Sequence, residues 1–308
     1  MIQKDDISGA AERIRPHVRK TPTLALGPDD LGLGYPIDLK LELFQHSGSF
    51  KARGAFNSLL SMDVPKAGVV AASGGNHGAA VALAAARLGV PARIFVPEIA
   101  GETKIGLIRA AGVEPDVVSG AYADAFAASE AYRNETGAMS IHAYDAPATL
   151  AGQGTVGLEI EEQLPEIDTL LVAVGGGGLI GGIASWFEGR VNVVAIEPEN
   201  ASTLHTALRD GPDATVEVGG IAANSLGARQ IGAMCYQVAT AQALPSVVVT
   251  DDAIRDAQRW LWTSARILAE PGGVCSLAAL TSGVYRPEPD ERIAVLICGG
   301  NVDPSPLG

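Results

Sequence analysis

The feature that most constrains the fold is a recurring unit in which a short apolar run, a glycine-rich turn and an alanine-rich helical stretch follow one another. One unit runs from Gly68–Ala72 into a helix predicted over Asn76–Leu88, and another runs from Leu170–Val174 into Leu179–Phe187. A final apolar run, Ile293–Ile297, predicts a last strand. Apolar strands that alternate with helices are typical of parallel sheets buried on both faces. We therefore expect an α/β protein with parallel sheets flanked by helices.

The composition narrows the class of protein. A chain of 308 residues with 47% hydrophobic and 19% charged residues fits a soluble globular enzyme with two lobes. The net charge of −13 disfavours nucleic acid or an anionic membrane as a partner, because both would repel the chain. Three cysteines are too few for a disulfide framework, which indicates a reducing cytoplasm. The uncharged stretch Thr169–Phe187 is long enough for a membrane span, but its six glycines favour a strand, a turn and a helix.

Three glycine-rich segments follow predicted strands: Ser73–Gly78, Gly175–Gly178 and Cys298–Asn301. Parallel sheets bind their ligands at the carboxyl ends of the strands. We expect the three segments to point their backbone N–H groups into one crevice.

Gly175–Gly178 lies between an apolar strand and a helix, which favours a cradle for a phosphate group over a simple tight turn. The phosphate could belong to a dinucleotide. Gly176, Gly178 and Gly181 satisfy the pattern G-x-G-x-x-G, and Glu197 follows Gly176 by 21 residues at the end of the next strand. That pattern alone is weak, so a single phosphate group remains the alternative.

Ser47-Gly48-Ser49-Phe50-Lys51 contains the candidate nucleophile. Ser47 or Ser49 can cap a helix whose first turn carries Phe50 and Lys51. A lysine beside an aromatic ring and the positive end of a helix shifts toward its neutral form, and neutral amines form Schiff bases. A lysine on a helix is ordinarily a solvated surface charge, so only these neighbours favour the chemical interpretation.

Ser73-Gly74-Gly75-Asn76-His77-Gly78 follows one strand and opens a helix. Its free N–H groups suit a carboxylate, and the Asn76 side chain can hydrogen-bond a phenolic oxygen. For His77 a structural role is favoured over a chemical one, because it lies inside an alanine-rich helix start.

These segments, in this order and spacing, resemble the fold-type II pyridoxal-phosphate enzymes, and more narrowly the serine/threonine dehydratase and serine racemase group. The resemblance implies a two-lobed fold like that of the tryptophan synthase β subunit. Residues 1–56 and 147–308 would form a large cofactor-binding domain, and residues 57–146 a small domain. It implies pyridoxal 5'-phosphate in a Schiff base with Lys51 as the catalytic residue. The cofactor would further contact Phe50, Asn76, Gly175, Gly176, Gly177, Gly178, Leu179 and Cys298, and the substrate carboxylate would contact Ser73, Gly74, Gly75, Asn76 and His77.

The same resemblance implies a homodimer that converts a small hydroxy amino acid, L-threonine or L-serine, into 2-oxobutanoate or pyruvate plus ammonia by β-elimination. Cys298 would face the pyridine nitrogen, and a thiol is a weak neutral donor, so the ring would be a modest electron sink that suits elimination. Serine racemase and hydroxyaspartate dehydratase are alternatives within the same fold, and a nicotinamide dehydrogenase is a distant one. The residues do not choose among these hydroxy amino acids or between D- and L-isomers.

Two positions depart from the family pattern. Gly74 stands where related racemases carry a serine that delivers a proton to the opposite face of the substrate. Relatives that bind a divalent ion use residues matching Glu197, the carbonyl of Ala201, and an aspartate where this chain has Thr203. Losing a carboxylate ligand weakens such a metal site. Glu197 is therefore either a plain surface acid or the remnant of a ligand set.

Overall fold

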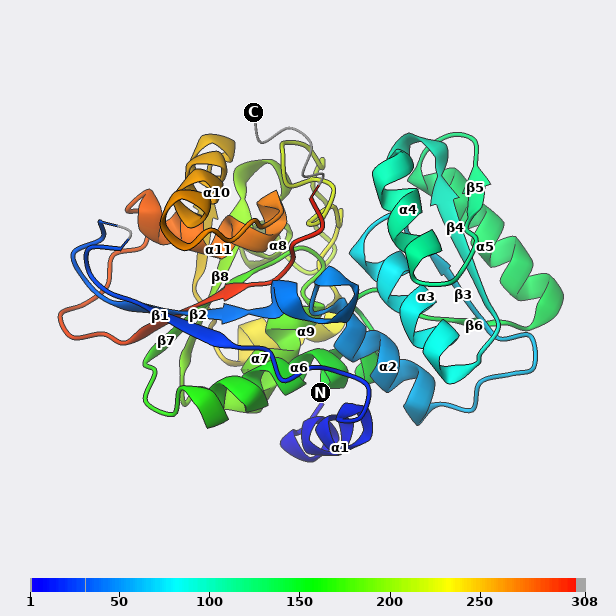
Figure 1. Cartoon of the computed structure of the whole chain (residues 1–308), viewed down its shortest axis with the longest axis horizontal. Coiled ribbons are helices and arrows are strands. Elements are labelled where there is room, and N and C mark those ends of the chain that lie inside the picture. Colours follow the sequence, from blue (N-terminus) through cyan, green and yellow to red (C-terminus); the bar gives the residue numbers. More distant parts are fainter. Residues whose placement is uncertain (1, 31, 303–308) are drawn as a thin grey trace.

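Two sheets with helices packed against them build the protein (Figure 1). The structure is a computed structural model that describes residues 2–30 and 32–302. The larger sheet has the strand order β1-β2-β10-β7-β8-β9, and the smaller has the order β5-β4-β3-β6. All neighbouring strands are parallel except β1 and β2, which are antiparallel. The α/β class with parallel sheets is therefore confirmed, and the antiparallel edge pair is an addition to it.

The strands of the larger sheet are β1 (Thr23–Leu26), β2 (Ile37–Leu41), β7 (Thr169–Ala173), β8 (Asn192–Pro198), β9 (Ser246–Val249) and β10 (Ile293–Ile297). Those of the smaller sheet are β3 (Val69–Ala72), β4 (Ala92–Pro97), β5 (Asp116–Val118) and β6 (Met139–Ser140). The helices that accompany the smaller sheet are α3 (Asn76–Leu88), α4 (Glu102–Ala110) and α5 (Tyr122–Thr136). The other helices are α1 (Lys4–Ile14), α2 (Lys51–Ser61), α6 (Pro147–Gln163), α7 (Gly178–Phe187), α8 (Thr203–Asp210), α9 (Ala233–Ala241), α10 (Asp251–Ala265) and α11 (Pro271–Thr281).

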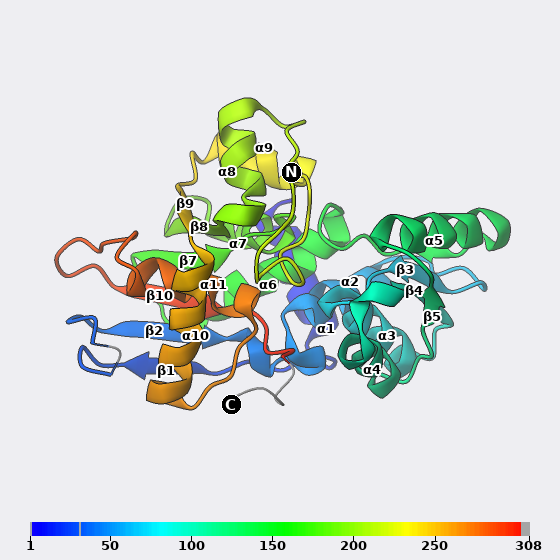
Figure 2. The same cartoon turned by 90° about the horizontal axis from the view of Figure 1, so that it is seen from above.

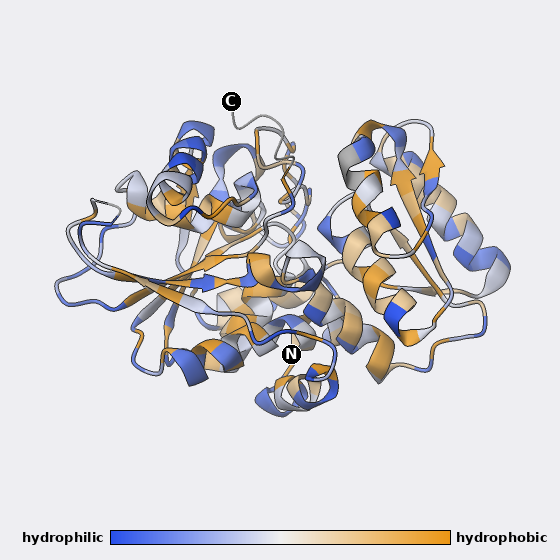
Figure 3. Ribbon diagram, viewed as in Figure 1, coloured by the Kyte–Doolittle hydropathy of each residue, from blue (hydrophilic) through white to orange (hydrophobic). Residues whose placement is uncertain are grey.

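The main hydrophobic core lies around the central strands of the larger sheet, where every residue of β7 and β10 is buried. Burial on both faces explains why these strands are continuous apolar runs and do not alternate. Figure 3 shows the apolar colour along the strands of both sheets, and hydrophilic colour on the outer turns of α5 and α10. A second core holds the smaller sheet against α2 and α3.

The two sheets lie at opposite ends of the molecule, with α2 and α6 near the junction, as the turned view shows (Figure 2). Helix α2 packs on α6 and also on α3, so it links both parts of the fold. Within the described part of the chain, no helix combines the length and apolar character that crossing a bilayer requires. The stretch 169–187 forms β7, the glycine turn and α7, as predicted.

Local signals located most elements but not all of their ends. The helix over Asn76–Leu88 and the strand over Ile293–Ile297 have the predicted bounds. Thr250 caps α10, because its side chain accepts a hydrogen bond from the N–H of Ala253. This helix ends at Ala265, because Arg266 takes a left-handed conformation with φ of 56°. Pro271 opens α11, because proline is well suited to a first helical position.

Candidate active site

One pocket lies where the glycine turn after β7, the loop after β10 and the starts of α2 and α3 converge. All nine residues predicted to contact a cofactor are on its wall: Phe50, Lys51, Asn76, Gly175, Gly176, Gly177, Gly178, Leu179 and Cys298. The turns follow the carboxyl ends of parallel strands, which is where α/β sheets hold their ligands. The structure thus brings together three segments that are far apart in the sequence.

Lys51 is the first residue of α2 and the one lysine on the described wall of the pocket. Its Nζ donates to the carbonyl of Ala143 at 2.7 Å and lies 5.2 Å from the centre of the Phe50 ring. Among the described residues no carboxylate forms an ion pair with it. Burial without a countercharge lowers the pKa of Lys51 to about 8. The amine is therefore poised to lose its proton near neutral pH.

The predicted serine cap of this helix is wrong. The N-cap is Phe50, which makes no side-chain cap, and the hydroxyls of Ser47 and Ser49 accept no helix N–H. Ser47 instead has a φ of 62°, and the loop is held by the loop after β10. The N–H of Phe50 donates to the carbonyl of Cys298 at 3.3 Å, and the N–H of Gly300 donates to the carbonyl of Gly48 at 2.9 Å. Tertiary pairing has replaced the local cap.

The four-glycine turn leads directly into α7, with Gly177 at the N-cap and a φ of 89°. The first-turn N–H groups of a helix have no partner within the helix, and its dipole favours an anion at that end. The carbonyl groups of the turn are occupied elsewhere: the Gly175 carbonyl accepts from Thr203 Oγ1 at 2.5 Å, and the Gly176 carbonyl accepts from the N–H of Gly232 at 3.0 Å. The turn therefore offers the pocket a helix start that suits an anion.

Packing also requires the glycines themselves. A Cβ at Gly176 would collide with the ring of Tyr144, and one at Gly178 would come within 2.8 Å of the backbone of Tyr144. A Cβ at Gly177 would collide with the Cys235 thiol. Tyr144 and Cys235 pack directly against the glycine turn, so a side chain at any of these three positions would displace them.

The predicted substrate loop reaches the pocket at only one point. Asn76 is on the described pocket wall, whereas Ser73, Gly74, Gly75 and His77 are not. The His77 ring nitrogen Nε2 hydrogen-bonds the carbonyl of Ile141 at 2.8 Å. Burial, helped by the charge of Lys51, lowers the pKa of His77 to about 3, so the ring is neutral. The structural interpretation of the histidine side chain is supported.

Glu197 is buried, and its carboxylate is engaged by neighbouring groups of the protein. Its side chain is fully buried at the end of β8, so the prediction of a plain surface acid is wrong. Its carboxylate accepts from the N–H groups of Leu204 at 2.8 Å and His205 at 2.7 Å, where it caps the start of α8. Burial raises the pKa of Glu197 to about 7, against the effect of these donors. Ala201 is buried nearby, and the described residues contain no cluster of three or more histidine, cysteine or acidic side chains.

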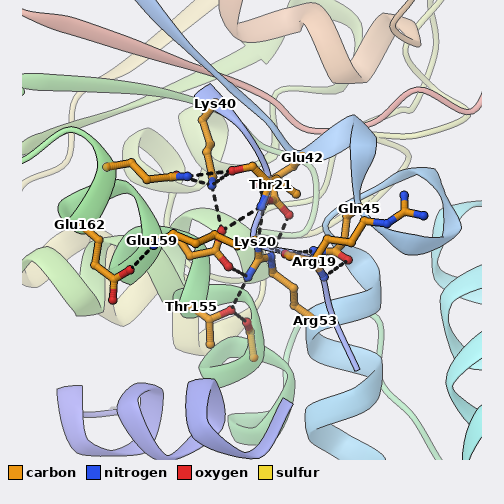
Figure 4. Close-up of polar contacts among 12 residues, drawn as sticks. Arg19, Lys20, Thr21, Lys40, Glu42, Gln45, Arg53, Thr155, Glu159 and Glu162 are labelled. Carbon is orange, nitrogen blue, oxygen red and sulfur yellow. Dashed lines mark hydrogen bonds and ion pairs between the residues drawn. The ribbon is translucent and has the colours of Figure 1, made fainter. Parts of the chain in front are cut away.

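A buried network of charges anchors α2 (Figure 4). Arg53 donates through Nε and Nη2 to both oxygens of Glu42 at 2.8 Å, and through Nη1 to Glu159 at 2.8 Å. Lys40 completes the network with a 2.8 Å ion pair to Glu159 and a hydrogen bond to Gln163. Two cations thus face two carboxylates, and the helix that carries Lys51 is fixed to β2 and α6.

Sequence reasoning missed several residues of the pocket wall. They come from separate loops and from the start of α11, and include Tyr144, Ser225, Leu226, Glu270 and Gly272. Only Glu270 had a usable signal, because it precedes Pro271 at a helix start.

Comparison with known proteins identifies the family. Residues 14–299 match the family described as pyridoxal-phosphate dependent enzymes. The chain belongs to this pyridoxal-phosphate dependent family. Its members use the cofactor that the resemblance implied, and the dinucleotide alternative is therefore overturned. The structure gives the physical reason, since the Glu197 carboxylate is buried and accepts hydrogen bonds from the N–H groups of Leu204 and His205 and from the hydroxyl of Ser246.

The relatives cover nearly the whole chain. An L-threonine ammonia-lyase of Thermotoga maritima is 34% identical over 98% of this chain and 76% of its own length. A serine racemase of Oryza sativa subsp. indica is 35% identical over 96% of this chain and 90% of its own. The solved structure of maize serine racemase superposes with a TM-score of 0.90 at 34% identity, covering 98% of this chain and 94% of that one. The fold is therefore that of a fold-type II ammonia-lyase or racemase.

Proposed function

We propose that the protein is an ammonia-lyase that converts L-threonine or L-serine into 2-oxobutanoate or pyruvate and ammonia by β-elimination. The observation that carries the proposal is the position of Lys51. An amine with a pKa lowered to about 8 shares one pocket with an anion cradle at a helix start. An uncharged amine can attack a carbonyl carbon and can later accept a proton, which are the two tasks that this reaction sets.

The pocket residues fit pyridoxal phosphate. Gly175 to Leu179 would hold the phosphate through the first-turn N–H groups of α7. Lys51 would bind the aldehyde, Asn76 the ring hydroxyl, and Cys298 would face the pyridine nitrogen. When bound, the cofactor supplies an electron sink that makes the α-proton of an amino acid removable.

Lys51 would remove that proton, because it is the basic side chain of the pocket with a lowered pKa. Burial raises the pKa of Cys298, so its thiol stays neutral, and in this structure it donates weakly to the carbonyl of Gly272 at 3.5 Å. A neutral partner would not keep the pyridine nitrogen protonated. Such a site favours a reaction in which negative charge leaves at once with the hydroxyl group.

Elimination over racemisation is supported by Gly74, which offers no side chain to reprotonate the opposite face. A Cβ at Gly74 would face Ala100 at 2.6 Å and Val96 at 3.0 Å, so a serine there would need the loop to move. His77 is a poor substitute, because it is neutral and bound to the Ile141 carbonyl. We expect L-serine to yield pyruvate and ammonia with little D-serine, measured by chiral chromatography. Wild-type enzyme that forms D-serine as fast as pyruvate would contradict the proposal.

Serine racemase and hydroxyaspartate dehydratase remain the alternatives, and the racemase relatives favour the first of them. An assay of keto acid and ammonia with L-threonine, L-serine, 3-hydroxyaspartate and the D-isomers would rank the substrates. Highest kcat/KM with L-threonine or L-serine is the expected result, and a preference for hydroxyaspartate would transfer the assignment to that dehydratase.

The organisation of the protein follows from the same proposal. We place the large domain at residues 1–56 and 147–308 and the small domain at 57–146, which puts the two sheets in different domains.

A cytoplasmic homodimer is the expected assembly. Light scattering of the purified protein would test whether its mass is that of a dimer.

A further inference from the structure

The amide of Asn76 is held between two neighbours at the edge of the pocket. Asn301 Nδ2 donates to Asn76 Oδ1 at 2.7 Å, and Asn76 Nδ2 donates to Glu270 Oε1 at 2.5 Å. Asn301 Nδ2 also donates to the carbonyl of Ser47 at 2.8 Å, so both of its N–H bonds are used. The side chains of Asn301 and Asn76 therefore form a relay, meaning a continuous chain of hydrogen bonds, from the Ser47 carbonyl to the Glu270 carboxylate.

The two ends of the relay fix its direction. If the Asn301 amide were reversed, its oxygen would face the Ser47 carbonyl; if the Asn76 amide were reversed, its oxygen would face the Glu270 carboxylate. Each reversal would oppose two acceptors, which is unfavourable away from water. Glu270 is itself held in place, because it is the N-cap of α11 and its N–H donates to the Gly299 carbonyl at 3.2 Å. The positive end of the α11 dipole lies beside this carboxyl group.

Gly299 leaves the space that this relay needs. A Cβ at Gly299 would collide with the Glu270 carboxylate and would come within 3.3 Å of Asn76 Nδ2. The sequence Cys298-Gly299-Gly300-Asn301 therefore supplies a wall residue, room for the hydrogen bond and the donor that starts it.

We propose that Glu270 is a positioning residue that makes the site bind the ionised form of the cofactor's ring hydroxyl, an inference that rests on the proposed function. The Oδ1 acceptor of Asn76 is occupied by Asn301, and one N–H of Asn76 is occupied by Glu270. The amide orientation that these two bonds fix leaves Asn76 its second N–H for the pocket, and an N–H stabilises an oxygen anion better than a hydroxyl.

The test is the absorbance of the holoenzyme together with the dissociation constant for pyridoxal phosphate. The ionised ring absorbs in the visible and the neutral ring in the near ultraviolet. In Glu270→Ala we expect part of the visible band to move to the near ultraviolet, and the dissociation constant to rise about three- to tenfold. Glu270→Gln keeps an acceptor oxygen for Asn76 and should stay within about twofold of wild type, since the hydrogen bond is preserved.

The matched control is Glu291→Ala. Glu291 lies before β10, at the opposite end of the strand from the pocket, and accepts from the Tyr285 hydroxyl at 2.7 Å. Its loss should lower stability without changing the spectrum. If Glu270→Ala does not fold, Asn301→Ala removes the donor at the other side of Asn76 and should shift the band in the same direction.

The outcomes separate the two proposals. A colourless wild-type protein that does not bind pyridoxal phosphate would overturn the proposed function. A yellow wild-type protein whose spectrum and cofactor affinity are unchanged in Glu270→Ala, or in Asn301→Ala where that is the variant used, would overturn the role of Glu270 alone. A Glu291→Ala spectrum that shifts equally would also overturn it, because the shift would then report general destabilisation.

Discussion

Lys51 and Arg53 lie two residues apart on α2, and their surroundings are opposite. Arg53 is buried among carboxylates: burial alone would lower its pKa, but Glu42 and Glu159 outweigh burial and raise it. Lys51 is enclosed with a carbonyl oxygen as its hydrogen-bond partner, and its pKa falls to about 8. One helix therefore carries a cation whose charge is fully compensated and an amine whose charge is not.

The paired charge of Arg53 suits a structural role, and the unpaired amine of Lys51 suits a chemical one. A buried ion pair with complete hydrogen bonding holds elements in register, and breaking one side of it is costly. A lysine without a countercharge stores unfavourable energy in its charged form, which is the condition for a nucleophile and base near neutral pH. The first arrangement keeps the second in place, because both are on the same rigid helix.

The largest expected effect is the loss of activity in Lys51→Ala. We expect turnover to fall by about 10⁴-fold or more and the visible absorbance to vanish, since no other lysine is on the described pocket wall. The free energy of unfolding of the cofactor-free protein should be unchanged or raised, because a desolvated amine is removed. Urea unfolding of wild type and Lys51→Ala, both without cofactor, measures this free energy. A marked loss of stability in Lys51→Ala would show that Lys51, like Arg53, stabilises the fold.

Arg53→Ala should show the reverse pattern. Without Arg53, Glu42 loses its bidentate partner inside the protein, and we expect the free energy of unfolding to fall by about 3–5 kcal/mol. Arg259 is the matched control, because its 3.0 Å pair with Asp256 is exposed on α10. Arg259→Ala should change stability by less than about 0.5 kcal/mol. If Arg53→Ala and Arg259→Ala lost the same free energy of unfolding, the buried network would stabilise the protein no more than an exposed ion pair.

The pH dependence of cofactor capture gives a smaller, graded effect. The pKa of Lys51 is lowered from 10.5 to about 8, so the neutral amine of the folded protein appears as pH rises through about 8. The rate at which the cofactor-free enzyme captures pyridoxal phosphate should rise with that midpoint. Between the two pKa values the unfolded chain binds the extra proton, so this lysine makes stability rise with pH from about 8 to 10.5. A capture midpoint near 10 would show that Lys51 behaves as a solvated amine.

The smallest effect is expected from chelators. Glu197 is saturated by hydrogen bonds, and the Thr203 hydroxyl donates to the Gly175 carbonyl at 2.5 Å. The divalent-ion site of the relatives would here have one carboxylate, Glu197, in place of two. We therefore expect EDTA to change activity by less than about twofold. Strong loss of activity that Mg²⁺ restores would contradict this interpretation of Glu197 and Thr203.

The sequence predicts those elements whose pattern is contained in a short segment of the chain. The apolar run Ile293–Ile297 and the helix over Asn76–Leu88 have the predicted bounds, because strand and helix periodicity is contained in the segment itself. The three glycine-rich segments were located for the same reason, and parallel-sheet geometry explains why they meet.

What could not be predicted depends on partners distant in the sequence. Lys40, Glu42 and Arg53 are charged residues that a sequence places on the surface, and only mutual pairing explains their burial. Glu270 and Asn76 are 194 positions apart and share a hydrogen bond. The Ser47 and Ser49 caps failed because pairing with the loop after β10 replaced the local interaction.

In the proposed function, Lys51 carries the cofactor covalently. Reducing the yellow holoenzyme with borohydride, digesting it and sequencing the peptides by mass spectrometry tests this directly. We expect one modified peptide, with the reduced pyridoxyl phosphate group on Lys51 in the sequence Ser-Gly-Ser-Phe-Lys-Ala. A modified peptide centred on another lysine, or retention of the yellow colour and the modification in Lys51→Ala, would contradict it.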